Sequence, residues 1–223
     1  MEFRHEWKHQ MLYSDLLALR ARLTAVMAWD AHAVKGKYEI RSLYFDNLAD
    51  KALREKMDGV NCREKFRIRY YNGDISHILL EKKEKVNGLC SKAQAELTVQ
   101  EAQAIAGGET ERLANSEKTL VQELRRKMVT QGLRPRTIVD YTREPFVYAP
   151  GNVRVTLDYN IRTGLMCTDF LNPDCITIPV RDAPMILEVK WDAYLPAVIR
   201  DIVQIPSLHA AAFSKYAACR MYD

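Results

Sequence analysis

The order of apolar and polar positions predicts an α+β protein. Residues 2–10 alternate between charged side chains and aromatic or His side chains, which is the period of a strand. Over residues 14–30, Leu, Val and Met recur at helical spacing after Ser14-Asp15, a predicted N-cap. Residues 37–47 are rich in β-branched and aromatic side chains and predict a strand, and residues 47–57 predict a short helix.

The rest of the chain predicts hairpins and further helices. Two strand-like runs in residues 62–85 flank Asn72-Gly73-Asp74, a strong hairpin signal. A third strand follows in 92–98, then helices near 98–107 and 117–132, the second ending at Gly132. Further elements are strands in 136–148, 152–161 and 185–191, a helix in 192–204 and a helix or turn in 213–222. With no repeat or linker, residues 1–223 predict one domain with an antiparallel sheet.

Charged residues recur two positions apart in successive predicted strands. Residues at this spacing share one face of a strand, and the positions between them are mostly apolar. The sets that share a face are Arg67 and Arg69, Glu81 and Lys83, the tyrosine Tyr141 with Arg143, Arg154 with Thr156 and Asp158, and Glu188 and Lys190. Two interpretations remain open: the charged faces form the outside of the sheet, or the sheet curls and they face a common water-filled lumen.

Cations outnumber carboxylates on these faces. The cations are Arg4, Lys8, Arg67, Arg69, Lys83, Arg143, Arg154 and Lys190, and the carboxylates are Glu2, Glu6, Glu81, Asp158 and Glu188. Converging guanidinium and ammonium groups suit repeated phosphate binding, and interspersed carboxylates suit Mg²⁺ or Mn²⁺. The sequence contains no Walker loop and no G-x-G-x-x-G, so side chains would have to hold a nucleotide.

Composition adds limits but no function. The 223 residues are 48% hydrophobic and carry a net charge of +4. The apolar stretches are shorter than the roughly 20 residues that span a bilayer, and the first ten residues lack a secretory apolar region. Five cysteines without a C-x-x-C pair argue against a disulfide framework and a zinc site, and favour the cytoplasm.

Several motifs together resemble one family over the whole chain. They are FRIRYYNGD, LLEKKEK, SKA, DYTREPF, VRVTLD, ILEVKW and FSKY. They resemble the VTC-type polyphosphate polymerase domain, a branch of the triphosphate tunnel metalloenzymes of the CYTH superfamily. The resemblance implies an antiparallel β-tunnel, a closed barrel of about eight strands lined by basic residues and flanked by helices. It also implies transfer of the γ-phosphate of ATP to a growing polyphosphate chain with Mn²⁺ or Mg²⁺.

The resemblance assigns expected roles to individual residues. Arg4 and Lys8 would lie on the first tunnel strand, and Arg67 and Arg69 would grip triphosphate oxygens. Glu188 would hold the metal, and Ser214-Lys215 would contact phosphate from the C-terminal helix. The remaining expected phosphate-binding residues are Lys83, Lys92, Tyr141, Arg143, Arg154 and Lys190. Lys215, Arg67, Arg69 and Glu188 are the predicted catalytic set.

Two departures from the superfamily pattern bear on the activity. Its triphosphatases carry E-x-E-x-K on the first strand, where this chain has Arg4-x-Glu6-x-Lys8, which favours the polymerase. Ala212 stands where a further lysine can occur in the family.

The alternatives to the polymerase are an inorganic or nucleoside triphosphatase and a non-catalytic polyanion-binding module. The expected ligands are ATP and polyphosphate or triphosphate, with no specific nucleic acid, in a soluble bacterial protein without a membrane segment; a regulatory partner protein is left open.

Overall fold

The computed structural model describes residues 4–87, 89–210 and 212–222, so Glu2 lies outside the described residues. The main strands of the fold are β1 (His5–Met11), β3 (Tyr38–Asp46), β4 (Arg63–Tyr71), β5 (Asp74–Val86), β6 (Leu89–Leu97), β7 (Arg134–Tyr148), β8 (Val153–Thr163) and β10 (Met185–Trp191). Three two-residue strands are β2 (Ala28–Trp29), β9 (Ile178–Pro179) and β11 (His209–Ala210). The helices are α1 (Tyr13–Val26), α2 (Lys51–Met57), α3 (Val99–Gly107), α4 (Thr119–Gln131), α5 (Ala197–Val203) and α6 (Lys215–Cys219).

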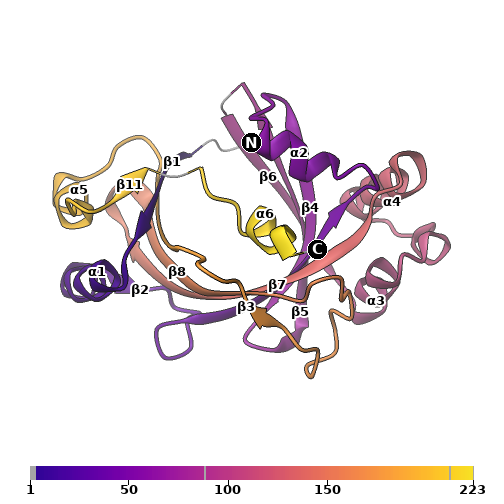
Figure 1. Ribbon diagram of the computed structural model, residues 1–223, viewed down its shortest axis with the longest axis horizontal. Coiled ribbons are helices and arrows are strands. Elements are labelled where there is room, and N and C mark those ends of the chain that lie inside the picture. Colours follow the sequence, from indigo (N-terminus) through magenta and orange to yellow (C-terminus); the bar gives the residue numbers. More distant parts are fainter. Residues whose placement is uncertain (1–3, 88, 211, 223) are drawn as a thin grey trace.

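The strands form a single antiparallel sheet that curves into a half-pipe (Figure 1). Its order is β11-β1-β10-β8-β7-β3-β4-β5-β6, with β2 on β7 and β9 on β8. We call β1, β10 and β8 the first wall, β7 and β3 the floor, and β4, β5 and β6 the second wall. The predicted hairpin between β4 and β5 is confirmed: Asn72 and Gly73 both have positive φ, 54° and 73°, as its tight turn requires.

Helices cover the convex side of the sheet in two groups. Behind the second wall, Phe66, Ile68 and Leu80 pack with Leu124 of α4 and with α3 in one apolar core. Behind the first wall, Leu157 and Val189 pack with α1 and α5 in another. Each fully buried side chain of this size contributes about 1.5–3 kcal/mol, so these outer cores supply a large share of the stability of the fold.

The concave side receives the C-terminal helix α6, which lies inside the curve of the sheet (Figure 1). Tyr216 of α6 is buried and stacks on Tyr44 of the floor, with ring centroids 5.2 Å apart. The hydroxyl of Tyr216 donates to buried Asp46 at 2.8 Å. These contacts fix α6, and therefore Lys215 at its first turn, against the floor.

The sheet is open, so the expected closed barrel is not observed. Within the described residues, the facing margins are β6 on the second wall and β1 with the two-residue strand β11 on the first wall, and no pairing joins them. Backbone pairing needs strands about 4.8 Å apart, whereas a hollow of about 570 Å³ lies between these margins. Long charged side chains, Glu6 and Lys83 among them, occupy the gap together with α2 and residues 212–214.

Two local expectations are also corrected. The first helix begins earlier than its expected N-cap: Leu12 is the N-cap, and Asp15 accepts a hydrogen bond from its backbone N–H at 2.8 Å. The expected helix over 192–204 is confined to Ala197–Val203, because Pro196 is tolerated only before or at the first turn. No helix in the described part of the chain is both long and apolar enough to cross a bilayer.

Candidate functional site

A cavity of about 120 Å³ lies on the concave face, between the two walls. Strand alternation turns alternate side chains of β4, β5 and β10 toward it, while their apolar neighbours enter the outer cores. Among its described lining residues, eight side chains are cationic and two are carboxylates. The lining residues are Lys8, Tyr44, Lys65, Arg67, Glu81, Lys83, Lys92, Tyr141, Arg143, Glu188, Lys190, Phe213, Ser214 and Lys215.

Asp158 of β8, in the first wall, holds two cations that come from other elements, Arg143 of β7 and Lys215 of α6. Arg143 donates to both of its carboxylate oxygens at 2.7 Å, and Lys215 Nζ donates to Oδ2 at 2.6 Å. The Asp158 side chain has no exposed surface. Burial opposes its ionisation, but the charges of Arg143 and Lys215 lower its pKa to about 2. Asp158 is therefore an anion that fixes two cavity cations in place.

Glu188 of β10 is the second buried carboxylate of this wall. Its Oε1 lies 3.2 Å from Lys190 Nζ and 3.5 Å from Lys8 Nζ, and its Oε2 lies 3.4 Å from Arg143. Burial works against its charge, yet Lys190, Lys8 and Arg143 hold the pKa of Glu188 well below its ordinary value. Glu188 is thus ionised and directed into the cavity.

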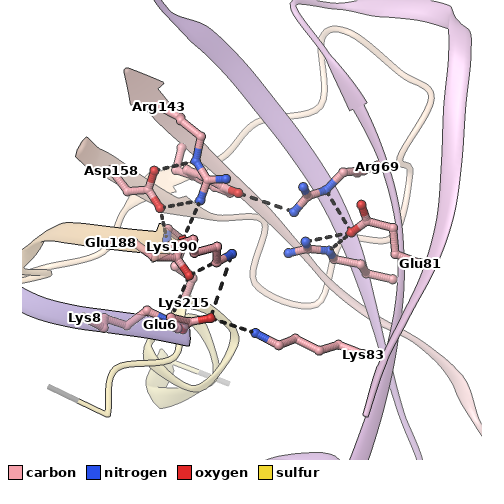
Figure 2. Close-up of polar contacts among 12 residues, drawn as sticks. Glu6, Lys8, Arg69, Glu81, Lys83, Arg143, Asp158, Glu188, Lys190 and Lys215 are labelled. Carbon is pink, nitrogen blue, oxygen red and sulfur yellow. Dashed lines mark hydrogen bonds and ion pairs between the residues drawn. The ribbon is translucent and has the colours of Figure 1, made fainter. Parts of the chain in front are cut away.

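One contact bridges the two walls. Glu6 of β1 accepts from Lys8 on its own strand at 2.9 Å and lies 3.5 Å from Lys83 Nζ of β5. Figure 2 shows this second contact crossing the cavity from the first wall to the second. A side-chain ion pair therefore stands where a closed barrel would have backbone pairing.

Glu81 of β5 organises the second wall as Asp158 organises the first. Its Oε2 accepts from Arg67 Nε at 2.7 Å and lies 3.5 Å from Arg69 Nε, and its Oε1 lies 2.6 Å from Lys92 Nζ. Burial disfavours its charge, but Arg67, Arg69 and Lys92 lower the pKa of Glu81 far below its ordinary value. Each wall consequently has a buried carboxylate behind a group of cations.

Three lysines form a row across the second wall. Lys65 of β4 is directly opposite Lys83 of β5, which is directly opposite Lys92 of β6. Like charges in such pairs repel and destabilise a sheet. Within the described residues Lys65 has no ion pair, and burial together with Arg67 and Lys83 lowers its pKa well below the ordinary value. Lys83 and Lys92 have carboxylate partners in Glu6 and Glu81, so Lys65 is the described member of the row that lacks one.

Tyr141 of the floor lies among cations from β4, from its own strand β7 and from α6. Lys215 Nζ is 4.5 Å from its ring centroid, and Arg69 donates to its hydroxyl at 3.4 Å. Burial raises the pKa of a phenol, but Arg143, Arg69 and Lys215 outweigh it and lower the pKa of Tyr141. Its hydroxyl is therefore held where anionic oxygens are favoured.

The carboxylates of the cavity decide whether it could hold a divalent cation. Mg²⁺ is commonly held by one or two carboxylates together with oxygens of substrate phosphates. Glu188 fits this mode, because it is buried, ionised and turned toward the cavity, and its present partners are cations that a phosphate would also attract. The described cluster of Glu64, Glu84 and Glu123 instead surrounds Lys82 and does not line this cavity.

The cavity contains most of the residues that the sequence predicted as its site. They are Lys8, Arg67, Lys83, Lys92, Tyr141, Arg143, Glu188, Lys190, Ser214 and Lys215. The Arg69 side chain is 4% exposed and does not line the cavity; it lies against Glu81 and Tyr141. The hydroxyl of Ser214 accepts from Ala217 N–H at 3.3 Å, so it caps α6 as well as lining the cavity.

Two predicted residues are placed elsewhere. Arg4 precedes β1 and pairs with Asp192 at 2.6 Å. Arg154 has the expected strand and alternation, but its guanidinium lies 3.2 Å from Asp30. Neither lines the described cavity, because each has an acidic partner distant in sequence that the alternation does not reveal.

Several cavity residues are absent from the predicted set. Lys65 continues the alternation of Arg67 and Arg69 by one more step, so the pattern contained the signal for it. Glu81 and Asp158 were among the interspersed carboxylates expected to suit a divalent cation, but neither was included in the predicted set of site residues. Tyr44 and Phe213 line the cavity through the placement of the floor and α6, for which the sequence gives no local signal.

Comparisons with known proteins bear on the fold and the family. A candidate adenylate cyclase from Bacillus halodurans is similar in structure, with a TM-score of 0.53 and 14% identity over 85% of this chain and 80% of that one. A protein from Pyrococcus horikoshii matches with a TM-score of 0.49 and 11% identity over 98% and 96%. No curated protein matches the chain.

At such low identity these likenesses concern the fold alone, and the sequence carries the assignment. The model of the family described as the VTC domain matches residues 3–222, nearly the entire chain, and so confirms the resemblance that the motifs indicated. The chain therefore belongs to the VTC domain family.

Proposed function

We propose that this protein is a polyphosphate polymerase, which transfers the γ-phosphate of ATP to the end of an inorganic polyphosphate chain. Family membership supports a phosphate-related activity. The observation that carries the proposal is the excess of cations at the cavity, above all the row of Lys65, Lys83 and Lys92. Like charges held side by side are costly without an anion, and a linear chain of phosphates would neutralise a whole row at once.

The second wall and the cations held by Asp158 would bind different parts of the substrates. Arg67 and the lysine row of the second wall would orient a chain of phosphates by ion pairs. Arg143 of the floor and Lys215 of α6, both held by Asp158 of the first wall, would face the transferred group. Phosphoryl transfer depends mainly on positioning and on stabilisation of charge on the equatorial oxygens, which fixed cations supply.

The acceptor in this reaction requires no general base, because a terminal phosphate is already ionised. No His is found among the described residues that line the cavity, which accords with that chemistry. Glu188 would hold Mg²⁺ or Mn²⁺ together with phosphate oxygens, and the cation would offset negative charge on the triphosphate. The reaction converts ATP and a chain of n phosphates into ADP and a chain of n + 1.

The decisive experiment incubates the purified protein with ATP and Mn²⁺ or Mg²⁺, resolves the products on polyacrylamide gels and measures ADP. The proposal predicts chains longer than triphosphate and one ADP for each phosphate added. Single phosphates released from triphosphate without chain growth would identify a triphosphatase. Polyphosphate binding without turnover of either substrate would identify a binding module. Either result would overturn the polymerase.

A matched pair of lysine variants links the activity to the cavity. The side chains of Lys92 and Lys51 are both 49% exposed, but only Lys92 lines the cavity. We expect Lys92→Ala to lower kcat/KM for ATP at least 10-fold, and Lys51→Ala to leave it within 2-fold. Equal effects would place the reaction outside this cavity.

A further inference from the structure

A pair of cysteines lies close together in the segment that joins β8 to β9. The sulfur atoms of Cys167 and Cys175 are 3.0 Å apart, and both residues are partly buried against the outer core. The phosphate cavity does not include them among its described lining residues. The proposed function gives this pair no role.

Backbone hydrogen bonds hold the two cysteines near each other, and no bond between the sulfur atoms is needed for this. Cys167 N–H donates to Gly164 O at 2.9 Å, and Cys175 N–H donates to Asn172 O at 3.2 Å, so each cysteine ends a turn. Between them, Phe170 is fully buried, and its carbonyl accepts from the Tyr70 hydroxyl at 3.2 Å.

A cation of the floor secures the second turn. Arg41 donates to the carbonyls of Asn172 and Cys175 at 2.8 and 3.4 Å while forming a bidentate pair with Asp140. The juxtaposition of the two thiols is therefore a property of the folded segment.

We propose that Cys167 and Cys175 are a reversible dithiol that is oxidised to an intramolecular disulfide by a low-molecular-weight disulfide such as oxidised glutathione. A disulfide bond is about 2.05 Å long, so the sulfurs must approach by roughly 1 Å. The segment 167–175 contains no regular helix or strand that would resist this movement.

The exchange proceeds in two steps. The Cys167 thiolate attacks one sulfur of oxidised glutathione, which forms a mixed disulfide and releases one glutathione thiolate. The Cys175 thiolate then attacks the Cys167 sulfur, forms the intramolecular bond and releases the second glutathione thiolate. The two protons lost by the cysteines are taken up by the two glutathione thiolates, and two electrons pass to glutathione.

The environment of the thiols favours this order of attack. Burial, with added contributions from the contact with Cys167, raises the pKa of the Cys175 thiol to about 12. Such a thiol is a poor first nucleophile near neutral pH. In the mixed disulfide the contribution of the Cys167 contact to this raised pKa is removed, and burial remains its main cause.

The test equilibrates the full chain in reduced and oxidised glutathione, traps free thiols by alkylation and identifies them by peptide mass spectrometry. We expect a peptide pair linked through Cys167 and Cys175, with Cys62, which is exposed, recovered as a free or glutathionylated thiol. Closing this short loop should raise Tm by about 3–8 °C, reversed by dithiothreitol.

Three variants complete the test. The double variant Cys167→Ser with Cys175→Ser should lose the dependence of Tm on the redox buffer, and Cys62→Ser should retain it. If the double variant does not fold, the thiol mapping on the wild-type chain decides alone. Recovery of Cys167 and Cys175 as separate alkylated or glutathionylated residues, or linkage of either to another cysteine, would overturn the proposal.

Discussion

Lys215 and Asp158 form the contact that fixes the C-terminal helix to the first wall: Lys215 Nζ lies 2.6 Å from Oδ2 of the fully buried carboxylate. Arg143 holds both oxygens of the same carboxylate, so Asp158 keeps a cationic partner when Lys215 is removed. Removal of the Lys215 ammonium group therefore takes one cation from the cavity while the Asp158–Arg143 pair stays in place.

Replacing Lys215 by Met should reduce activity far more than stability. We expect kcat to fall at least 100-fold, because one cation facing the transferred phosphoryl group is lost. The free energy of unfolding should fall by about 1–3 kcal/mol, since Asp158 remains paired with Arg143. Steady-state kinetics and urea unfolding measure the two effects. The control, Lys118→Met, breaks the more exposed pair with Glu101 and should cost about 1 kcal/mol or less without changing kcat.

The buried carboxylates make the folded state sensitive to acid. Asp158 has a pKa of about 2 in the folded protein against an ordinary value of 3.8. Because the folded pKa is lower, the stabilisation is fully present above the ordinary pKa and is lost as the pH falls from about 4 to about 2. For Asp158 alone this amounts to about 2 kcal/mol. Urea unfolding across this range should show a shallower pH dependence for Asp158→Asn than for the wild type; identical slopes would contradict the assignment.

Replacing Lys65 by Met should make the folded protein more stable and should weaken its binding of polyanions. Its ammonium group faces Lys83 across the strands and has no ion pair in the described part of the chain, so Lys65→Met should raise the free energy of unfolding by up to about 1 kcal/mol. The same change should weaken tripolyphosphate binding at least 5-fold, because a cation of the row is lost. Calorimetric titration with tripolyphosphate and urea unfolding test both effects. A variant that is less stable and binds equally well would show that Lys65 has a structural role.

Replacing Glu188 by Gln should lower the turnover of ATP without weakening the binding of tripolyphosphate. Glu188→Gln removes the proposed metal ligand and makes the cavity more positive. We expect turnover of ATP to fall at least 100-fold, whereas tripolyphosphate binding measured in the presence of EDTA stays equal or becomes tighter. Glu96→Gln changes a carboxylate that is 63% exposed on β6 and should alter neither quantity. Weaker metal-free binding in Glu188→Gln would mean that this carboxylate supports the anion site by positioning its cations.

Alternation along β4 and β5 was sufficient to predict which side chains share the charged face. It was sufficient because successive side chains of a strand point to opposite faces, and a change of one residue in the register that pairs Arg67 with Glu81 would bury the charges. The outer cores behind these strands follow from the same pattern, since Phe66 and Ile68 alternate with the arginines.

Sequence reasoning was less successful where the outcome depends on distant residues. Arg154 has the expected spacing, but its guanidinium forms an ion pair with Asp30 instead of lining the cavity. Asp30 is distant in sequence, so the strand pattern does not reveal this partner. Closure of the barrel likewise depends on whether the margins of β1 and β6 meet, and no local pattern encodes that distance. The placement of Phe213 depends on how α6 docks, through Tyr216, onto the floor.

The open sheet has a mechanical consequence. Within the described residues, the two walls are connected by backbone pairing only through the floor, and Glu6 and Lys83 are the side chains that link them across the gap. Their separation is therefore set by the bending of β3 and β7, whose pairing shifts register between Tyr44 and Phe45. A polyanion that contacts cations of both walls would add ion pairs across the same gap, so its binding would draw the two walls together.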